Sequence, residues 1–537
     1  MTWRTQAGIL PEAAASVVVI GRQPADNAES RAVEVVLALV VAALVLGGLS
    51  LAFRSNSLVA DLPITEDAYY AFSVSSHVAH GDGVTVDGVE ATNGFQPLFT
   101  FLTVPLFVGD DPFVPLRLIL VVQVGIFTAT GWVLGLVVRD AVPAPRAFGR
   151  RSMVLLPMAL YLAASFAMRI YLNGLETGFV LLLYAVIWRV YQRRGISGPT
   201  DAAVLGVLFG LLVLARIDAL FAAGVFTLVY VLHRRSQPRR AIGDVCVVGL
   251  LALLISSPWW IYNAVEFGSL LPTSGAAQQL WALEPSRLSN LVRALAQVVV
   301  PWIFYGDRFD RLWPASAVLI GAGVVLWWAK ARVWATETAR DFPLADRASR
   351  AREFLAVLLI AGGLLAVWYG ASSWAVHFYP RYLALLILPA IFLWAQLTLA
   401  IGGRAPRLAV GLVSVAALLG LAYTMTFHSR AAFSGSDMWR DQVPLVEKTV
   451  PDGEVVAAGQ SGTLGYFREP VLNLDGKVNA EAYERRGEIA DYLVSKDVRW
   501  VCDWPSYLHR YLGDDPTSLG WVERAREGQF RCLERVR

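Results

Sequence analysis

Residues 61–107 read DLPITEDAYYAFSVSSHVAHGDGVTVDGVEATNGFQPLFTFLTVPLF, and the rest of the chain is organised around this stretch. An acidic pair, Glu66 and Asp67, opens a run that is typical of a helix, and a glycine-rich turn and an apolar run at 95–107 follow. A strongly apolar segment comes before the stretch, so the pair lies at the edge of a membrane. Carboxylates there are costly unless they are solvated or paired, which makes them candidates for function. We therefore expect the protein to build a cavity around Asp67.

The composition indicates a membrane protein. Of 537 residues, 56% are hydrophobic and 17% are charged, and the mean hydropathy is +0.51. About a quarter of the residues of a soluble protein are charged. The net charge of +3 is too small to indicate nucleic acid as a partner. We expect a polytopic α-helical protein embedded in the lipid bilayer.

Apolar segments long enough to cross about 30 Å of hydrocarbon predict about eleven transmembrane helices. Basic short loops stay in the cytoplasm, and the loop after the second span contains four arginines between residues 139 and 151. The N-terminus is then inside, and the first loop and the C-terminal part are outside. The segment 203–233 is read as two short helices broken at 216–218, because one helix would place the basic string HRRSQPRR outside. The predicted spans are 32–53, 112–138, 152–168, 175–190, the broken pair in 203–233, 241–263, 313–329, 354–370, 382–400 and 407–426.

The chain divides into three predicted parts. Residues 1–31 form a cytoplasmic tail, 32–427 form the transmembrane module with its first outer loop at 54–111, and 428–537 form a small extracytoplasmic domain. Strand-like and helix-like segments alternate in the last part, which predicts an α/β fold. Cys502 and Cys532 both fall there; they can pair if the domain is exported, and two free thiols are the alternative.

The predicted sidedness brings polar residues from distant parts of the chain to one face of the membrane. A carboxylate there can remove a proton from an attacking hydroxyl, and arginines can hold a phosphate and offset its charge as it leaves. The sequence has no P-loop, so an activated donor on this face must carry its energy in its own phosphate ester. The candidate residues are Glu66, Asp67, Asn93, Gln96, Arg169, Glu176, Arg216, His377, Tyr379, Arg381 and Tyr382.

The string TEDAYYAF…GDGVTVDG…TNGFQPLFTFL resembles the first outer loop of the GT-C superfamily of membrane glycosyltransferases. The stretches NGLETG at 173–178, LARIDAL at 214–220, FGSLLPTS at 267–274 and FYPRYLALLILP at 378–389 agree in order. LGYFREPVLNLDGKVN at 464–479 is similar to the exported tail segment of bacterial members. The superfamily uses polyprenyl-phosphate sugars and includes protein O-mannosyltransferases, lipid A aminoarabinose transferases and mycobacterial arabinofuranosyltransferases. The resemblance implies a GT-C fold with juxtamembrane helices in the first outer loop.

The resemblance also implies roles for the candidate residues. The acidic motif supplies the general base, which falls on Glu66 and Asp67, and Asp67 is the preferred choice. Arg381, His377 and Arg216 are the candidates for neutralising the lipid phosphate. The sequence has no dedicated metal cluster; a divalent cation, which some members use, stays an option. The remaining candidates for substrate binding are Tyr382, Tyr379, Arg169, Glu176, Gln96 and Asn93.

We therefore expect an inverting glycosyltransferase of the bacterial cytoplasmic membrane. It would move a sugar from a polyprenyl-phosphate donor to a hydroxyl of a glycan, lipid or protein acceptor, in cell-wall or glycoconjugate assembly. The alternatives are a transporter or flippase for a lipid-linked solute and a non-catalytic cell-envelope assembly protein. Asp67 also has a structural interpretation as a helix cap, and Arg216 and Asp218 have one as a pair that satisfies itself at a helix break.

Overall fold

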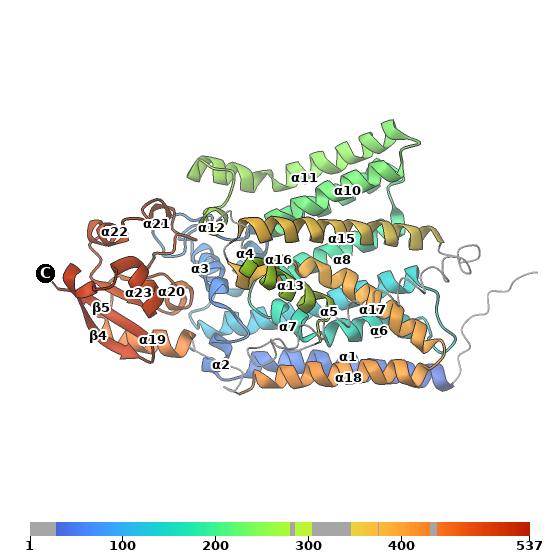
Figure 1. The fold of residues 1–537 in the computed structure, drawn as a ribbon, viewed down its shortest axis with the longest axis horizontal. Helices are drawn as coiled ribbons and strands as arrows, with labels where there is room; N and C mark the ends of the chain where they lie inside the picture. Colours follow the sequence, from blue (N-terminus) through green and yellow to red (C-terminus); the bar gives the residue numbers. More distant parts are fainter. Residues whose placement is uncertain (1–27, 280–284, 303–344, 374, 430–437, 537) are drawn as a thin grey trace, which may run out of the picture.

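The computed structural model describes residues 28–279, 285–302, 345–373, 375–429 and 438–536. A bundle of long helices runs along the molecule, and a small α/β domain, which contains the C-terminus, lies at one end of the bundle (Figure 1). Most of the predicted N-terminal tail and the predicted span at 313–329 lie outside the described residues.

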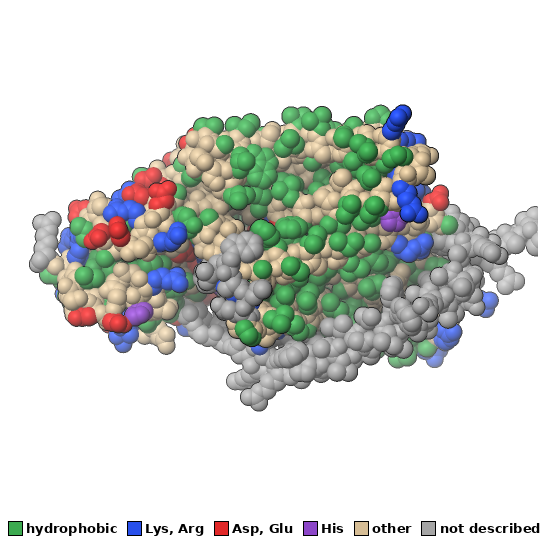
Figure 2. Space-filling view, turned by 45° about the horizontal axis from the view of Figure 1, so that its top comes forward, with side chains coloured by type: hydrophobic (Ala, Val, Ile, Leu, Met, Phe, Trp, Pro, Cys, Tyr) green, Lys and Arg blue, Asp and Glu red, His purple; other side chains and the backbone are tan. Residues whose placement is uncertain are grey.

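Within the described residues, helices lie at each of the predicted spans, and two of them, α6 and α7, share the span predicted at 152–168. Hydrophobic side chains dominate the middle of the molecule, and charged side chains gather toward its two ends (Figure 2). The buried sides of the helices form one core, which also takes in Tyr69 and Phe72 of the first outer loop. The helices are α1 (Ala28–Ser50), α5 (Phe113–Ala141), α6 (Ser152–Leu162), α7 (Ser165–Tyr171), α8 (Thr177–Arg194), α9 (Pro199–Ala215), α10 (Leu220–His233), α11 (Pro238–Phe267), α15 (Ala345–Ser372), α17 (Ile387–Gly402) and α18 (Pro406–Thr426).

The chain is a multi-pass membrane protein, but fewer helices have the length of a full span than the sequence predicted. Among the described residues, six helices are long and apolar enough to cross a membrane, or up to seven if α6 and α7, bent by 74°, count as one span. The helices α9 and α10 have 17 and 14 residues, which gives lengths of about 26 and 21 Å at the helical rise. Each is shorter than the hydrocarbon layer. By length and composition the described residues therefore give fewer spans than the expected eleven, and the span predicted at 313–329 lies outside them.

The predicted break in the segment 203–233 is confirmed. Helix α9 ends at Ala215, and Arg216 has an extended backbone with φ −166°. A short 3-10 turn, Ile217–Ala219, then leads into α10. The side chain of Arg216 is buried, 7% exposed, and Asp218 pairs with it. Irregular backbone at membrane depth is tolerated where protein surrounds it, and this break meets that condition.

The first outer loop folds into the expected juxtamembrane helices, α2 (Asn56–Ala60), α3 (Glu66–His80) and α4 (Pro97–Thr103). Helix α3 packs tightly against the loop before α8. A Cβ at Gly174 would lie 2.6 Å from the Cβ of Ala68, and φ at this position is +82°, so glycine is required there. The glycine of the NGLETG stretch therefore allows α3 to lie directly on the helical bundle.

The C-terminal domain contains a mixed sheet with the strand order β2-β1-β3-β5-β4, which confirms the predicted α/β fold. The first three strands in this order are parallel, and β5 and β4 continue the sheet antiparallel. Cys502 and Cys532 lie opposite each other on β3 and β5 and form a disulfide. The strands are β1 (Val456–Ala458), β2 (Val471–Asn473), β3 (Trp500–Asp503), β4 (Trp521–Glu527) and β5 (Phe530–Arg535). The helices are α19 (Met438–Thr449), α20 (Gly462–Phe467), α21 (Ala480–Glu484), α22 (Ile489–Ser495) and α23 (Pro505–Leu512).

The carboxyl ends of the parallel strands face α3. The segment after β1 contacts Glu66 through Gly462, and the segment after β2 contacts Asp67 through Lys477. Tyr69 of α3 also packs its ring 5.2 Å from that of Tyr466 in α20. In open α/β sheets this edge, at the point where the strand order reverses, is where ligands bind. The domain therefore presents its usual ligand-binding edge to the membrane module.

Gly94 lies where the first outer loop meets the C-terminal domain. A Cβ at this position would collide with the carbonyl oxygen of Lys477, at less than 3.0 Å. We expect Gly94→Ala to lower the free energy of unfolding by about 1–3 kcal/mol through this overpacking. Thermal unfolding and limited trypsin digestion of the detergent-solubilised protein measure the effect. Gly109→Ala is the control, because nothing lies within 4 Å of a Cβ there, and equal effects of both changes would contradict the assigned contact.

Candidate functional site

Asp67 lies in the first turn of α3, and cations from two distant parts of the chain flank its carboxylate. Lys477, from the loop after β2, places its Nζ 3.3 Å from Oδ1. Arg381, in α16 (Tyr379–Tyr382), places its Nη1 3.8 Å from Oδ2. The side chain of Asp67 is 19% exposed, so part of it is accessible. The preferred base of the sequence analysis thus lies beside one of the predicted arginines.

Arg381 connects Asp67 to a second, more deeply buried group of charges. Its Nη2 donates a hydrogen bond of 3.1 Å to Oε1 of Glu176, and Nη1 of Arg216 lies 3.6 Å from the same oxygen. Nη2 of Arg216 also lies 3.0 Å from Oδ2 of Asp218. Glu176 and Arg216 are 4% and 7% exposed, and charges so buried require partners of opposite sign. Alternating charges therefore run from Asp67 to the break between α9 and α10.

Aromatic rings pack against the inner end of this row of alternating charges. Tyr369 of α15 stacks on Tyr382 with 3.9 Å between the ring centres, and the guanidinium of Arg216 lies 5.2 Å from the ring centre of Tyr382. The hydroxyl of Tyr369 donates to Asp218 at 2.8 Å, and that of Tyr382 donates to Gln278 at 2.6 Å. The predicted residue Tyr382 is therefore part of the cluster.

Glu66 turns away from the cluster and into the C-terminal domain. Its carboxylate accepts hydrogen bonds from the backbone N–H of Gly462 at 2.6 Å and of Thr463 at 3.1 Å, and from the hydroxyl of Thr463. These are the first residues of α20, whose N–H groups have no partner within the helix. Glu66 thus anchors the domain on α3, and Asp67 is the member of the pair that faces the cations.

His77 fastens the other end of α3 to the same domain. Its Nε2 lies 3.0 Å from Oε1 of Glu469, and its Nδ1 lies 3.3 Å from Oδ2 of Asp82. The imidazole is 8% exposed. The interaction with Glu469 raises the pKa of His77 to about 9, against the opposing effect of burial. His77 is therefore a cationic structural anchor at neutral pH.

The neighbouring charges set the protonation state of the candidate base. Burial alone would raise the pKa of Asp67, but the positive charges of Lys477 and Arg381 outweigh it and hold the pKa below its ordinary value. Burial raises the pKa of Glu66, although the hydrogen bonds from α20 oppose the shift. Burial also lowers the pKa of His377. Asp67 is thus ionised at neutral pH, as a group that accepts a proton must be.

Two further predicted residues lie around the cluster. His377 is in the short turn Val376–Phe378 just before Arg381 and is close enough to Asp67 to interact with it electrostatically. Asn93 is buried, and its Oδ1 accepts hydrogen bonds from the backbone N–H and the hydroxyl of Thr273 at 3.1 and 2.8 Å. Asn93 therefore joins the first outer loop to the FGSLLPTS stretch.

The other predicted residues have positions that favour structural roles. Tyr379 is buried and donates a hydrogen bond of 3.1 Å to the carbonyl of Ser373. Gln96 comes directly before α4, where its carbonyl accepts the hydroxyl of Thr100 at 2.9 Å. Arg169, on α7, is exposed and interacts with Tyr423 of α18. The contact with Tyr423 favours a structural role for Arg169, and its predicted substrate role stays a prediction.

Lys477 and its neighbour Asp475 are not among the residues predicted from the sequence. Oδ2 of Asp475 lies 3.3 Å from the Nζ of Lys477, so both belong to the site. They lie in the string VLNLDGKVN, which is part of the resemblance, and this string is the feature of the sequence that points to them. The contact between Lys477 and Asp67 joins residues 410 positions apart, and local sequence patterns do not report such contacts.

The acidic residues of the site do not fit a divalent cation. Hard cations take several oxygen ligands, whereas Asp67, Glu176 and Asp218 each face a lysine or an arginine. Within the described ranges, no group of three or more His, Cys, Asp or Glu side chains is arranged to hold a metal ion.

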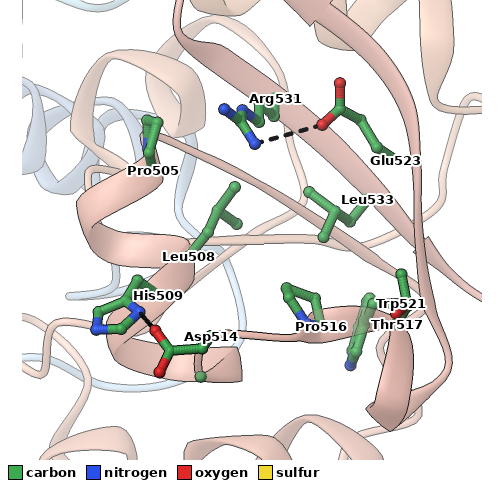
Figure 3. A pocket seen from close by; sticks show the side chains of 11 residues that line it. Pro505, Leu508, His509, Asp514, Pro516, Thr517, Trp521, Glu523, Arg531 and Leu533 are labelled. Atoms are coloured by element: carbon green, nitrogen blue, oxygen red, sulfur yellow. Dashed lines mark ion pairs between the residues drawn. The ribbon is translucent and has the colours of Figure 1, made fainter.

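Two cavities lie outside the charge cluster. One, of about 220 Å³, lies in the C-terminal domain between α23 and the β4–β5 hairpin. His509 pairs with Asp514 on one side of it, and Arg531 pairs with Glu523 on the other (Figure 3). None of the predicted site residues lines it.

The second cavity, of about 320 Å³, is apolar and lies where α4, α9 and α11 meet. One of its lining residues, Pro97, directly follows the predicted residue Gln96 in the sequence. The walls of the cavity are almost free of polar groups. Such a cavity suits a hydrocarbon chain. Residues that line it include Val84, Pro97, Leu98, Phe101, Leu214 and Trp259.

The helical bundle, the juxtamembrane helices and the small α/β domain define the class of fold, that of a polytopic helical membrane protein with an α/β domain at one end. Comparison of the sequence with protein-family models and with curated proteins gives no match. The fold, in contrast, is similar to solved structures. The crystal structure of ArnT from Cupriavidus metallidurans in the apo state matches 95% of this chain and 99% of its own, with a TM-score of 0.56 and 15% sequence identity.

The structure of the same ArnT bound to undecaprenyl phosphate matches 93% of this chain and 98% of its own, with a TM-score of 0.56 and 13% identity. The likeness confirms the expected GT-C fold over nearly the full length of the chain. Since the sequence identity is low, this likeness shows the fold alone.

The His77–Glu469 ion pair predicts a pH-dependent stability. The pKa of His77 is about 9 in the folded protein against an ordinary value of 6.5. The pair therefore stabilises the fold fully below about pH 6.5, and its contribution is lost as the pH rises through about 9. We expect the difference in thermal unfolding temperature between wild type and His77→Gln to shrink between about pH 7 and pH 10. His80→Gln, on the exposed end of α3, is the control, and a constant difference for His77→Gln across this range would contradict the ion pair.

Proposed function

We propose that the protein is an inverting glycosyltransferase that moves a sugar from a polyprenyl-phosphate donor to an acceptor hydroxyl. The observation that carries this proposal is the position of Asp67, an ionised and accessible carboxylate beside Arg381. A base next to a cation is what a reaction needs when a hydroxyl attacks and a phosphate leaves. The fold likeness to ArnT, which has been solved with undecaprenyl phosphate bound, supports the choice of donor.

The geometry suggests a single displacement. The acceptor oxygen bonds to the anomeric carbon of the sugar while the bond from that carbon to the phosphate oxygen breaks. The acceptor proton goes to Asp67, and the electron pair leaves with the phosphate. Arg381 offsets the added negative charge; its side chain is 18% exposed, and its Nη1 already faces Asp67. Arg216 supports Arg381 from behind through Glu176.

The apolar cavity between α4, α9 and α11 is our candidate for the prenyl chain. Tyr262 lines it and donates to the carbonyl of Thr92 at 3.0 Å, and the hydroxyl of Thr92 donates to the carbonyl of Val478 at 2.8 Å. Val478 follows Lys477, so two hydrogen bonds connect the cavity wall to the charge cluster. A donor with its phosphate near Arg381 and its prenyl chain in the cavity would have its charge beside a cation and its hydrocarbon among apolar side chains.

The proposed location is the outer face of a bacterial cytoplasmic membrane, with the N-terminus inside. Figure 2 supports this orientation, because basic side chains gather at the end of the bundle away from the α/β domain, as expected of cytoplasmic loops. The acceptor, a glycan, lipid or protein, would then be part of the cell envelope. A role in cell-wall or glycoconjugate assembly follows from this placement.

Asp67→Asn tests the proposed base. The amide keeps the shape of the side chain but cannot take the acceptor proton, so we expect transfer to fall by about 10²–10⁴-fold. Binding of undecaprenyl phosphate should stay at least as tight, because the cations lose a competing anion. The assay is release of free polyprenyl phosphate from a panel of polyprenyl-phosphate sugars, with the protein in proteoliposomes.

Asp110→Asn is the matched control, an exposed acid of the same outer loop that should leave transfer unchanged. Wild-type rates in Asp67→Asn would refute the assigned base. Movement of the lipid-linked sugar across the bilayer without release of polyprenyl phosphate would favour the flippase alternative instead.

Leu98→Trp tests the place of the prenyl chain. Leu98 lines the apolar cavity, and the larger ring fills part of it. We expect KM for a long-chain donor to rise about tenfold, which corresponds to about 1.4 kcal/mol, while KM for a short-chain donor stays unchanged. Leu102→Trp is the control, since this residue of the same helix is 56% exposed. If Leu98→Trp changed KM by the same factor for both donors, the prenyl chain would have to lie elsewhere.

A further inference from the structure

The loop after β2 carries Lys477 from the C-terminal domain to the candidate base. Its Nζ lies 3.3 Å from Oδ1 of Asp67 and 3.3 Å from Oδ2 of Asp475. It also lies 6.0 Å from the ring centre of Phe378, over whose ring Arg381 is placed at 5.8 Å. Lys477 and Arg381 therefore both lie beside Asp67, and each faces a different oxygen of its carboxylate.

Contacts from both domains fix the backbone of this loop. The N–H of Lys477 donates to Oδ1 of Asp475 at 2.9 Å. The carbonyl of the next residue, Val478, accepts the hydroxyl of Thr92 from the first outer loop at 2.8 Å. Gly94 of that loop leaves no room for a Cβ against the carbonyl of Lys477. The lysine is thus held at the interface by specific packing, and it is not a mobile surface side chain.

The chemistry of Lys477 fits that of a phosphate ligand. An ammonium group has three N–H donors, and Asp67 and Asp475 occupy two directions. The negative charges of Asp67 and Asp475 outweigh the effect of burial and raise the pKa of Lys477, so the group stays protonated. Its side chain is 21% exposed, which leaves it accessible to a donor in the same space as Arg381.

We propose that Lys477 is a catalytic residue of the transferase proposed above, on which this inference rests, and that the C-terminal domain in this way supplies part of the donor site. The ammonium group holds Asp67 in the free protein and moves its hydrogen bond to a phosphate oxygen when the polyprenyl-phosphate donor binds. This exchange frees Oδ1 of Asp67 to accept the proton of the acceptor hydroxyl. No covalent bond changes in the exchange, and Lys477 keeps its proton throughout.

The exchange links donor binding to the readiness of the base. Before the donor arrives, both oxygens of Asp67 face cations, and a paired carboxylate is a weaker proton acceptor. The phosphate draws Lys477 away and leaves the carboxylate less stabilised, so its affinity for a proton rises when the reaction needs it. A transferase built in this way activates its acceptor only with the donor in place.

Binding and kinetics of the full chain in nanodiscs test the inference, with undecaprenyl phosphate as the binding probe. We expect Lys477→Gln to weaken binding of undecaprenyl phosphate at least tenfold and to lower kcat for transfer at least a hundredfold. Lys477→Arg, which keeps the charge, should bind within about threefold of wild type. Lys496→Gln is the matched control, a lysine of the same domain that pairs with Glu481 at 2.8 Å, and it should change neither value.

The pH profile tests whether Lys477 acts on the candidate base. The titratable groups that face Asp67 are Lys477, Arg381, His377, Tyr70 and Tyr382, with Glu66 beside it on α3. Since Lys477 lowers the pKa of Asp67 in the free protein, Lys477→Gln should move the acid limb of kcat/KM to higher pH. This shift checks the ion pair between Lys477 and Asp67, and the fall in binding of undecaprenyl phosphate checks the contact of Lys477 with the phosphate.

The possible outcomes distinguish a failure of the proposed function from a failure of the role proposed for Lys477. If wild type neither binds undecaprenyl phosphate nor transfers a sugar, the proposed function fails. If wild type does both and Lys477→Gln matches it in binding and in the acid limb, the role of Lys477 alone is overturned. If Lys477→Gln does not fold, Lys477→Arg decides, because a loss of binding in a folded protein that keeps the charge would also overturn the proposal.

Discussion

The pairing of Asp67 with Lys477 and Arg381 is the interaction on which the site depends. A carboxylate at the rim of an apolar bundle tends to take up a proton, because burial disfavours its charged form. The two cations, at 3.3 and 3.8 Å, reverse that tendency and keep the group ionised. They come from the C-terminal domain and from the segment before α17, whereas Asp67 comes from the first outer loop. Three segments far apart in the sequence must therefore be in place before the site has the charge state that its chemistry needs.

Helix α3 is the element that joins these segments. It rests on the bundle through Ala68 and Gly174, and it is tied to the C-terminal domain by Glu66 at one end and His77 at the other. A helix fastened at both ends cannot rotate about its axis, and a turn of one residue, about 100°, would carry the carboxylate of Asp67 away from its cations. The anchors therefore make a rigid support out of an outer loop, and catalytic groups on rigid supports keep their geometry best.

The local features could be predicted from the sequence, and the features that depend on docking could not. Apolar length and helix signals are local, so α3, the break at Arg216 and the alternating elements of the C-terminal domain were all found. Neighbouring residues on a helix point about 100° apart, so Glu66 and Asp67 face different partners. Which of them faces the cations depends on how α3 meets a domain about 400 residues further along the chain. Lys477 was missed for the same reason. Sidedness alone suggests Arg169, and sidedness gives the end of a helix and not its face, so this prediction rests on less than the others.

The degree of burial separates the roles of the cations. Arg216 is 7% exposed and sits between Glu176 and Asp218; taking a partner from such a buried pair leaves a charge uncompensated and is strongly unfavourable. Arg381 and Lys477 are 18% and 21% exposed, so water and an incoming phosphate can replace a lost partner at little cost. A leaving group that binds and departs in every cycle needs cations of the second kind. The C-terminal domain can supply one because its lysine approaches from outside the bilayer and avoids the cost of a charge at membrane depth. Arg216 then keeps Glu176 and Arg381 in place, and the exchange of partners is confined to the mouth of the site.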